Sequence, residues 1–342
     1  MKYEQQMTSL GGTAPLVSII MCAYNAGEYL RASLVSVLTQ TYQNLDVVII
    51  DDGSTDDSFE SIADLLTDPR VRVFHQENAT RPVALNRALD LARGDFYAIQ
   101  DGDDISHPTR IERQARAMLN QPDVAAVFCG NELIINGRSM APTFAAKSID
   151  VCKREVDRFS MPAHDPTGMF RLSLVRDFRY QPNLPYVEAF DYILRVGEQH
   201  PMIVLGECLY SYRILWSSVT RRDPTRRVHY VAEALKQACA RRGVEYQRIY
   251  PDRTKLQSRN SITDNNLAAH FMASVLDQRG IGNYRNAVKT ALECARLHPL
   301  DPHYYKALIY ALAPPKFISF ILRRRSGQHD ERGRARAYAI DI

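Results

Sequence analysis

The chain has 342 residues, of which 45% are hydrophobic and 24% charged, and its formal net charge is +4. This composition is typical of a globular protein and excludes a disordered, fibrous or collagen-like chain. The length allows one large domain and a smaller one, and the small net charge gives no indication of a nucleic-acid partner.

The sequence shows none of the patterns typical of secreted or membrane-spanning proteins. No apolar run approaches the roughly 20 residues needed to cross a bilayer, and residues 1–13 lack the apolar core of a secretory signal. The six cysteines form no CxxC pair, so they do not predict a zinc site, and they fit a reducing compartment. We therefore expect a cytoplasmic protein.

The first hundred residues predict strands and helices in alternation. Nearly continuous apolar runs predict buried strands at 17–23, 45–50, 71–74 and 96–100. Apolar residues at helical spacing predict helices at 28–39 and 82–93, and a helix that Ser54 or Thr55 caps and that runs to about Leu66. Such alternation indicates an α/β fold, a Rossmann-like and mostly parallel sheet with helices on both faces.

The remainder of the chain predicts further α/β elements and then helices alone. Pro108 begins a predicted helix, a strand follows at 124–129, and residues 131–160 are expected to be irregular. A helix at 188–198, a strand at 203–212 and helices at 262–279, 284–298 and 303–312 come next. We expect four parts: an N-terminal tail at 1–15, an α/β domain at 16–225, a helical extension at 226–322 and a basic tail at 323–342.

Polar residues follow three of the predicted strands. They are Tyr24-Asn25, Asp51-Asp52 and the run Asp101-Gly102-Asp103-Asp104. Ligands of parallel sheets bind outside the carboxyl ends of the strands, so these clusters are expected to converge on one crevice. Crowded carboxylates repel one another unless a cation is bound, and Mg²⁺ and Mn²⁺ prefer such oxygen ligands. An acidic turn in water is the alternative for this run alone, but its position favours a site for a metal ion and a diphosphate.

The motifs resemble those of the family 2 glycosyltransferases. They occur in order as Val17 to Ile20 with Ala23-Tyr24-Asn25, Val48 to Asp56, Ala84-Leu85-Asn86, Ala92 to Asp95 and Gln100 to Asp104. The resemblance covers roughly residues 16–220. It implies a GT-A fold and an inverting transfer from a nucleotide-diphosphate sugar to a glycan or lipid-linked acceptor, as in cell-surface polysaccharide synthesis.

The resemblance also implies roles for individual residues on the donor side. The donor would be bound by Ala23, Tyr24, Asn25, Asp52, Arg81, Asp101 and Gly102. Asp52 would accept a hydrogen bond from the base, which favours uracil and a UDP-sugar. Asp103 and Asp101 would hold Mn²⁺ or Mg²⁺. Two alternatives stay open: Arg81 is a solvated loop residue, and Asp104 caps the following helix.

An inverting transfer needs one general base for the acceptor hydroxyl. The resemblance places it in the stretch 187–195, where Ala189 occupies the position usually taken by Asp. Glu188 is the first candidate and Asp191 the second, because residues three apart share a helix face and could both point into the crevice. The alternative is a domain that binds sugar nucleotides without turning them over.

The remaining candidates concern the acceptor side and the membrane. His164 and Thr167 resemble a segment that lines the acceptor side, and Trp216 could stack on a sugar or simply pack. The apolar stretch 314–322, followed by three arginines, either lies on an anionic membrane surface or forms a packed C-terminal helix. The first alternative would place the protein peripherally at the inner face of the membrane.

Overall fold

The computed structural model describes residues 14–215, 224–246, 262–297, 299, 302–318 and 320. A nine-stranded sheet is at its centre, with strand order β3-β2-β1-β4-β8-β6-β9-β5 and with β7 paired to β6. The strands are β1 (Val17–Ala23), β2 (Leu45–Asp51), β3 (Val71–His75), β4 (Phe96–Asp101), β5 (Ile105–Ser106), β6 (Ala126–Ile135), β7 (Arg138–Met140), β8 (Met169–Arg171) and β9 (Met202–Arg213).

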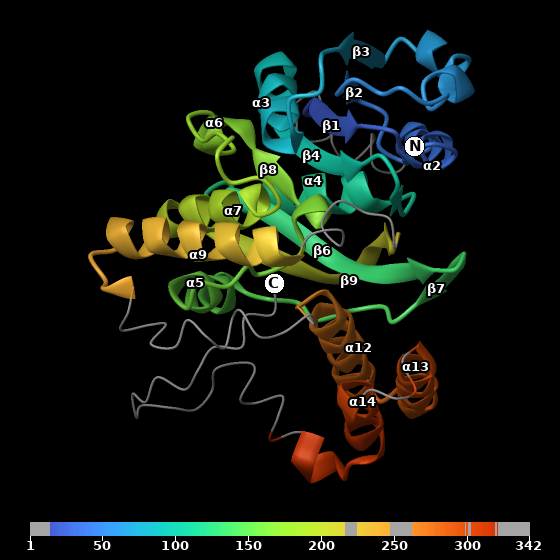
Figure 1. Cartoon of the computed structure of the whole chain (residues 1–342), viewed down its shortest axis with the longest axis vertical. Coiled ribbons are helices and arrows are strands. Elements are labelled where there is room, and N and C mark those ends of the chain that lie inside the picture. Colours follow the sequence, from blue (N-terminus) through green and yellow to red (C-terminus); the bar gives the residue numbers. More distant parts are fainter. Residues whose placement is uncertain are drawn as a thin grey trace.

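The sheet is mixed. β1 to β4 are all parallel, β8 joins β4 antiparallel, and β6 and β9 form a second parallel pair. Helices cover both faces (Figure 1), which confirms the predicted α/β class. The helices are α2 (Tyr29–Leu38), α3 (Arg81–Leu91), α4 (Arg110–Asn120), α5 (Ile149–Asp157), α6 (Leu172–Val175), α7 (Glu188–Gln199), α9 (Pro224–Arg241), α12 (Ile262–Gly280), α13 (Tyr284–Leu297) and α14 (Pro302–Leu312).

Each face of the sheet has its own hydrophobic core. Ile20, Val48 and Ile99 pack in one core with residues of α3 and α7. Their neighbours in sequence, among them Ile19 and Val47, pack in the other core with residues of α2 and α4. Successive strand side chains point to opposite faces, so a nearly all-apolar strand supplies both cores at once.

One sequence expectation for the loops is wrong, and a second holds only in part, because residues 141–146 of the stretch 131–160 have no regular structure. The helix expected to run to Leu66 is reduced to two short 3₁₀ turns, Glu60–Ile62 and Leu65–Thr67. Its expected caps are engaged elsewhere, because Ser54 Oγ accepts the Asn25 N–H and the Thr55 N–H donates to Asn25 Oδ1. The stretch 131–160 is also more regular than expected, since it contains the end of β6, all of β7 and α5.

The C-terminal helices pack on two different surfaces. Helix α9 packs against α7 and α5 in a core that includes Phe190, Leu194 and Leu235. Helices α12, α13 and α14 instead form a bundle at the far end of β6 and β7, where Leu133 and Ile214 join their core (Figure 1).

The bundle is also tied to the segment after β7 by hydrogen bonds. His270 Nε2 lies 2.8 Å from the Ala141 carbonyl oxygen, and Ser274 Oγ donates to the Pro142 carbonyl at 2.7 Å. Among the described residues, no helix combines the length and the apolar character needed to cross a membrane. Most of the expected tail at 1–15 and all of the basic tail at 323–342 lie outside the described residues.

Candidate functional site

The polar ends of β1, β2 and β4 lie side by side. In the register of the sheet, Ala23 is opposite Asp51 and Cys22 is opposite Asp101. The three clusters predicted from the sequence therefore meet at one edge, as the carboxyl ends of parallel strands should.

The loops after β1 and β2 are bound to each other. Asn25 has a φ of 49° and exchanges hydrogen bonds with Ser54 and Thr55, as described above. Gly53 has a φ of +80°, and a Cβ there would lie 2.8 Å from the Asn78 backbone nitrogen. Glycine is needed at this turn for both reasons. The ring of Tyr24 is exposed beside these loops.

Asp51 and Asp52 have different environments. Asp51 is held at the strand end, where Oδ1 accepts the Ser54 N–H at 2.8 Å and Oδ2 lies 2.8 Å from His75 Nδ1. Asp52 is buried, and its Oδ1 accepts from Gln76 Nε2 at 2.6 Å and from the Ala79 N–H at 3.0 Å. Both acids are thus fixed by the loops that surround the crevice.

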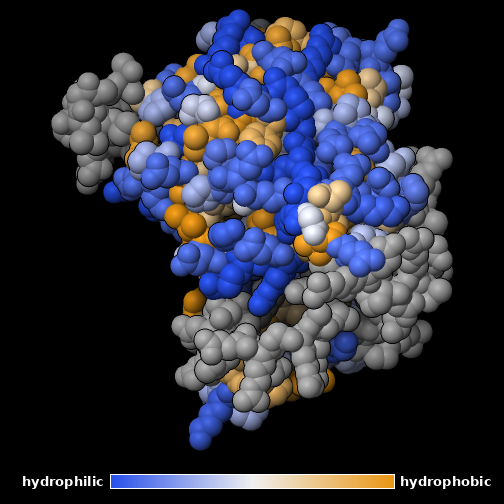
Figure 2. Space-filling model, turned by 90° about the vertical axis from the view of Figure 1, so that its left-hand side faces the viewer, coloured by the Kyte–Doolittle hydropathy of each residue, from blue (hydrophilic) through white to orange (hydrophobic). Residues whose placement is uncertain are grey.

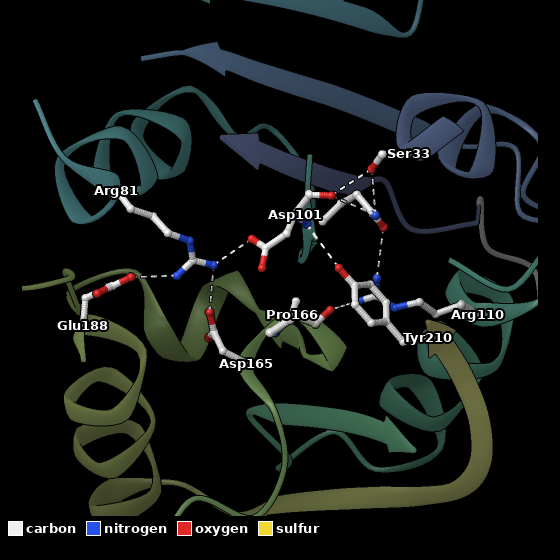
Figure 3. Close-up of polar contacts among 9 residues, drawn as sticks. Ser33, Arg81, Asp101, Arg110, Asp165, Pro166, Glu188 and Tyr210 are labelled. Atoms are coloured by element: carbon white, nitrogen blue, oxygen red, sulfur yellow. Dashed lines mark hydrogen bonds and ion pairs between the residues drawn. The ribbon is translucent and has the colours of Figure 1, made fainter. Parts of the chain in front are cut away.

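The backbone of Asp101 is held from two sides. Ser33 Oγ donates to its carbonyl at 2.8 Å, and its N–H donates to the Tyr210 hydroxyl at 3.2 Å (Figure 3). Arg110 lies with its guanidinium 4.7 Å from the centre of the Tyr210 ring and donates to the Pro166 carbonyl at 2.6 Å. Sequence reasoning missed the supporting roles of Ser33, Tyr210 and Arg110, because the elements that carry them are far apart in the chain.

Asp103 and Asp104 are both anchored to Arg213 at the end of β9. Arg213 Nε donates to the Asp103 carbonyl at 2.8 Å, and the Arg213 N–H donates to Asp104 Oδ1 at 2.7 Å. The alternative that Asp104 caps the following helix is wrong, because α4 begins at Arg110 and no side chain caps it. Gly102 is buried, and a Cβ at this position would contact the side chains of Ala23 and Ala26.

The residues at this turn fit a divalent cation. Burial and the neighbouring Asp101 raise the pKa of Asp103 to about 6, so a positive partner would relieve an unfavourable carboxylate. No group of three potential ligands occurs among the described residues. Mg²⁺ is commonly held by only one or two carboxylates and the phosphates of its substrate, so Asp101 and Asp103 would suffice.

Arg81, the first residue of α3, joins three acids from separate parts of the chain (Figure 3). Its Nη2 lies 2.8 Å from Asp101 Oδ1 and 3.3 Å from Asp165 Oδ2, and its Nη1 lies 2.8 Å from Glu188 Oε1. The Arg81 side chain is 31% exposed, whereas those of Asp165 and Glu188 are 5% and 6% exposed. The alternative of a solvated loop arginine therefore does not hold.

Two acids of this cluster each keep one buried oxygen without a hydrogen-bond partner, Asp165 Oδ1 and Glu188 Oε2. Burial raises the pKa of Asp165 to about 7, against the opposite effect of Arg81. Buried unpaired oxygens are costly, so these two acids are held in an unfavourable environment that Arg81 offsets only in part. Asp165 was not predicted from the sequence, because it reaches the cluster through the pairing of β8 with β4.

Asp191 is not brought to this cluster. Its Oδ2 accepts from Arg195 Nε at 2.7 Å, and its Oδ1 lies 3.4 Å from Arg241 Nη1 on α9. The arginine one turn further along α7 holds this carboxylate, so the two acids of the helix serve different neighbours.

The acceptor-side candidates lie close to the cluster in sequence and differ in their contacts. Thr167 is buried, and its hydroxyl donates to the His164 carbonyl in the turn before β8. The His164 ring lies 4.6 Å from that of Tyr212, its Nδ1 has no hydrogen-bond partner, and burial lowers its pKa to about 4. Trp216 lies outside the described residues.

The model of the glycosyl transferase family 2 matches residues 18–179 of the chain, which include the three strand-end clusters, Arg81 and Asp165. An uncharacterized glycosyltransferase of Haemophilus influenzae is 28% identical over 212 residues, which are 58% of this chain and 66% of that protein. The segment 18–179 is thus similar in sequence to glycosyltransferase family 2.

Solved structures share the fold at low sequence identity. TarS of S. aureus, solved in complex with UDP, has a TM-score of 0.53 and 17% identity, covering 90% of this chain and 91% of the TarS chain. The mannosyltransferase PcManGT of Pyrobaculum calidifontis, solved with GDP-Man and Mn²⁺, has a TM-score of 0.53 and 18% identity, covering 92% of this chain and 94% of its own. These neighbours define a GT-A-like architecture.

Proposed function

We propose that the protein transfers a sugar from a nucleotide-diphosphate sugar to a hydroxyl of a glycan or lipid-linked acceptor, with inversion and with the help of Mn²⁺ or Mg²⁺. The observation that carries this proposal is the single guanidinium of Arg81, which connects Asp101 of the donor motif to the buried Glu188. One side of this arginine would face the diphosphate, and the other would face the acceptor.

The donor would bind along the ends of β1, β2 and β4. Backbone groups at Ala23, Tyr24, Asn25 and Gly102 would line the nucleoside side, and Asp52 would accept a hydrogen bond from the base, which favours UDP. Asp101 and Asp103 would hold the cation, which supplies a Lewis acid that stabilises the charge of the departing nucleoside diphosphate. The diphosphate oxygens that keep their negative charge would accept charge-assisted hydrogen bonds from the guanidinium of Arg81.

Glu188 would take the proton of the acceptor hydroxyl as that oxygen attacks the sugar. Because Arg81 covers Glu188 and holds one of its two oxygens, a turn of Arg81 toward the diphosphate would uncover the carboxylate only when donor is present. His164 and Thr167 would line the acceptor side, and Asp191 would fix α7 through its arginines. We place this reaction in the cytoplasm, in the assembly of cell-surface polysaccharide.

Titration calorimetry with UDP and GDP, with and without Mn²⁺, tests the donor site. We expect UDP to bind in the presence of the metal, and we expect the variant Asp103→Ala to lose at least roughly tenfold in affinity, because its cation loses a ligand. The exposed Asp123 provides the control variant Asp123→Ala, which should bind like the wild type. Equal UDP affinity with and without metal would contradict the proposal.

A second candidate function is suggested by Ala189, which replaces the acid expected from the resemblance. A domain that binds sugar nucleotides without transfer would pass the calorimetric test. Release of nucleotide from a set of UDP- and GDP-sugars, measured with candidate acceptors, separates the two functions. Donor binding without any release above the uncatalysed rate would favour the binding domain.

A further inference from the structure

Helix α14 is apolar on two opposite sides. On its inner side, Tyr304, Ala307 and Ala311 are buried in the core that it shares with α12 and α13. On its outer side, Ile309 and Leu312 are 61% and 71% exposed, and Tyr305 one turn earlier is 42% exposed. The spacing of four and three residues places these three in one stripe. A helix that is apolar all round is normally covered on both sides.

The exposed apolar surface continues beyond α14. Phe317 and Phe320 are also exposed, and Ile281 is 63% exposed after the end of α12. Arg279 Nη2 donates to the Ala313 carbonyl at 2.5 Å, so the ends of α12 and α14 lie together. Hydrophobic residues reach the surface at the lower end of the molecule in Figure 2. The following residues are here called the apolar tip: Ile281, Tyr305, Ile309, Leu312, Phe317 and Phe320.

Within the sequence segment that carries most of the apolar tip, the charged residues are all basic. From Pro302 to His329 the sequence contains no Asp or Glu, but it contains Lys306, Lys316 and Arg323-Arg324-Arg325. Lys306 and Lys316 are exposed next to tip residues. An apolar surface with a cationic rim suits an anionic membrane, where acyl chains and headgroups supply both complements. A two-fold contact between copies would instead bring like charges together.

We propose that the apolar tip docks on an anionic lipid surface, with its side chains in the interface and without any segment crossing the bilayer. The bundle is rigidly attached, because α12 donates side-chain hydrogen bonds to the backbone after β7 and Ile214 enters the core of the bundle. Docking at the tip would therefore hold the whole α/β unit at the membrane. This inference goes beyond the proposed transfer and does not depend on it.

Co-sedimentation of the full chain with vesicles tests the inference. We expect the wild type to bind vesicles that contain phosphatidylglycerol, and to bind less to pure phosphatidylcholine and at high salt. The double variant Ile309→Glu/Leu312→Glu should bind roughly tenfold less, because it replaces two apolar anchors by anionic groups. Both positions are exposed, so its melting temperature should stay near that of the wild type.

Leu119 on α4 offers a matched control, because it is an exposed leucine of the α/β unit. The variant Leu119→Glu should bind vesicles like the wild type. The proposal is wrong if the wild type ignores anionic vesicles, or if the double variant binds them fully and the basic tail alone therefore suffices. It is also wrong if light scattering shows that the double variant only converts an oligomer into monomers, which would make the tip a contact between copies.

Discussion

Arg81 is the residue that links the proposed donor and acceptor sides of the candidate site. One guanidinium serves three carboxylates, so the cluster would carry a net negative charge if all three were ionised. The raised pKa of Asp165, at about 7, reduces this excess because that acid is protonated in about half of the molecules at pH 7. Glu188 then remains as the acid that pairs directly with Nη1 and keeps a second oxygen for a substrate.

The two acids can be distinguished by a pair of nearly isosteric variants. Glu188→Gln should lower kcat by about 10²- to 10⁴-fold and leave UDP affinity within a few-fold of the wild type, because only the proton acceptor is lost. Asp165→Asn removes a carboxylate from the same arginine and should retain most of the turnover, since an amide resembles the protonated acid. Single-turnover rates of both variants give the comparison. The opposite pattern would identify Asp165 as the base.

At the level of residues, the sequence was informative where chemistry is concentrated in short motifs. The polar residues at the ends of β1, β2 and β4 were predicted from the strand ends, and Glu188 was predicted from the start of a helix. Asp165 and Tyr210, whose hydroxyl accepts the Asp101 N–H, could not be predicted. They reach the crevice only because β8 and β9 pair with strands far away in the chain. The helix spacing of α7 also predicted Asp191 beside Glu188 in the crevice. Asp191 lies elsewhere, because Arg195 and Arg241 each bind one of its carboxylate oxygens.

The elements that carry the cluster begin beside unusual backbone conformations. Thr80, with φ 79° and ψ 151°, directly precedes α3, and Tyr186, with φ 71°, lies two residues before α7. Such conformations cost on the order of 1–3 kcal/mol each in residues other than glycine. They place Arg81 and Glu188 at the first positions of their helices, where the two side chains meet.

The turn after β2 supports a prediction about element geometry. Gly53→Ala should lower the free energy of unfolding by about 2–4 kcal/mol, because the residue has a positive φ and its Cβ would collide with the backbone at Asn78. Gly137→Ala is a matched control, since Gly137 has a φ of +73° with open space around it and should lose only about 1–2 kcal/mol. Urea unfolding measures both. Equal losses would mean that the close approach at Asn78 relaxes freely.

Elements with strong periodicity were predicted well, and each element that was predicted wrongly has an identifiable cause. The mostly apolar runs of β1, β2 and β4 have few alternatives to burial in a sheet, so their bounds agree with the structure within about a residue. The missing helix before Leu66 shows the limit of local rules, because Asn25 of another loop binds the residues expected to cap it. Likewise, the sequence predicts α9 as part of the helical extension, but this helix packs on α7.

On the scale of the whole molecule, two half-buried histidines, His164 and His270, lie near the junction between the α/β unit and the C-terminal bundle. Burial lowers the pKa of both His164 and His270 to about 4. The unfolded chain takes up protons at these residues below about pH 6.5, whereas the folded protein does so only near pH 4. The free energy of unfolding should therefore fall as the pH falls from about 6.5 to 4, by at most about 1.4 kcal/mol per pH unit for each histidine.

His270→Asn isolates this effect from opposing groups such as Asp165. Its free energy of unfolding should vary less with pH between 6.5 and 4 than that of the wild type, whatever its absolute value. Urea unfolding at several pH values provides the measurement, and His107→Asn, at an exposed position, should retain the slope of the wild type. An unchanged slope in His270→Asn would show that His270 does not contribute to the acid sensitivity.

The end of β9 has a consequence for how the chain can be shortened. Arg213 binds the backbone of Asp103 and the carboxylate of Asp104, and the next residue, Ile214, is buried among α12 to α14. A truncated enzyme that ends at residue 215 would retain every carboxylate discussed above. It would still leave Ile214 without its hydrophobic neighbours, and the donor motif would lose the rigid support of its last strand. The C-terminal helices are in this sense a structural part of the candidate site, and a boundary chosen from the family match alone would cut through it.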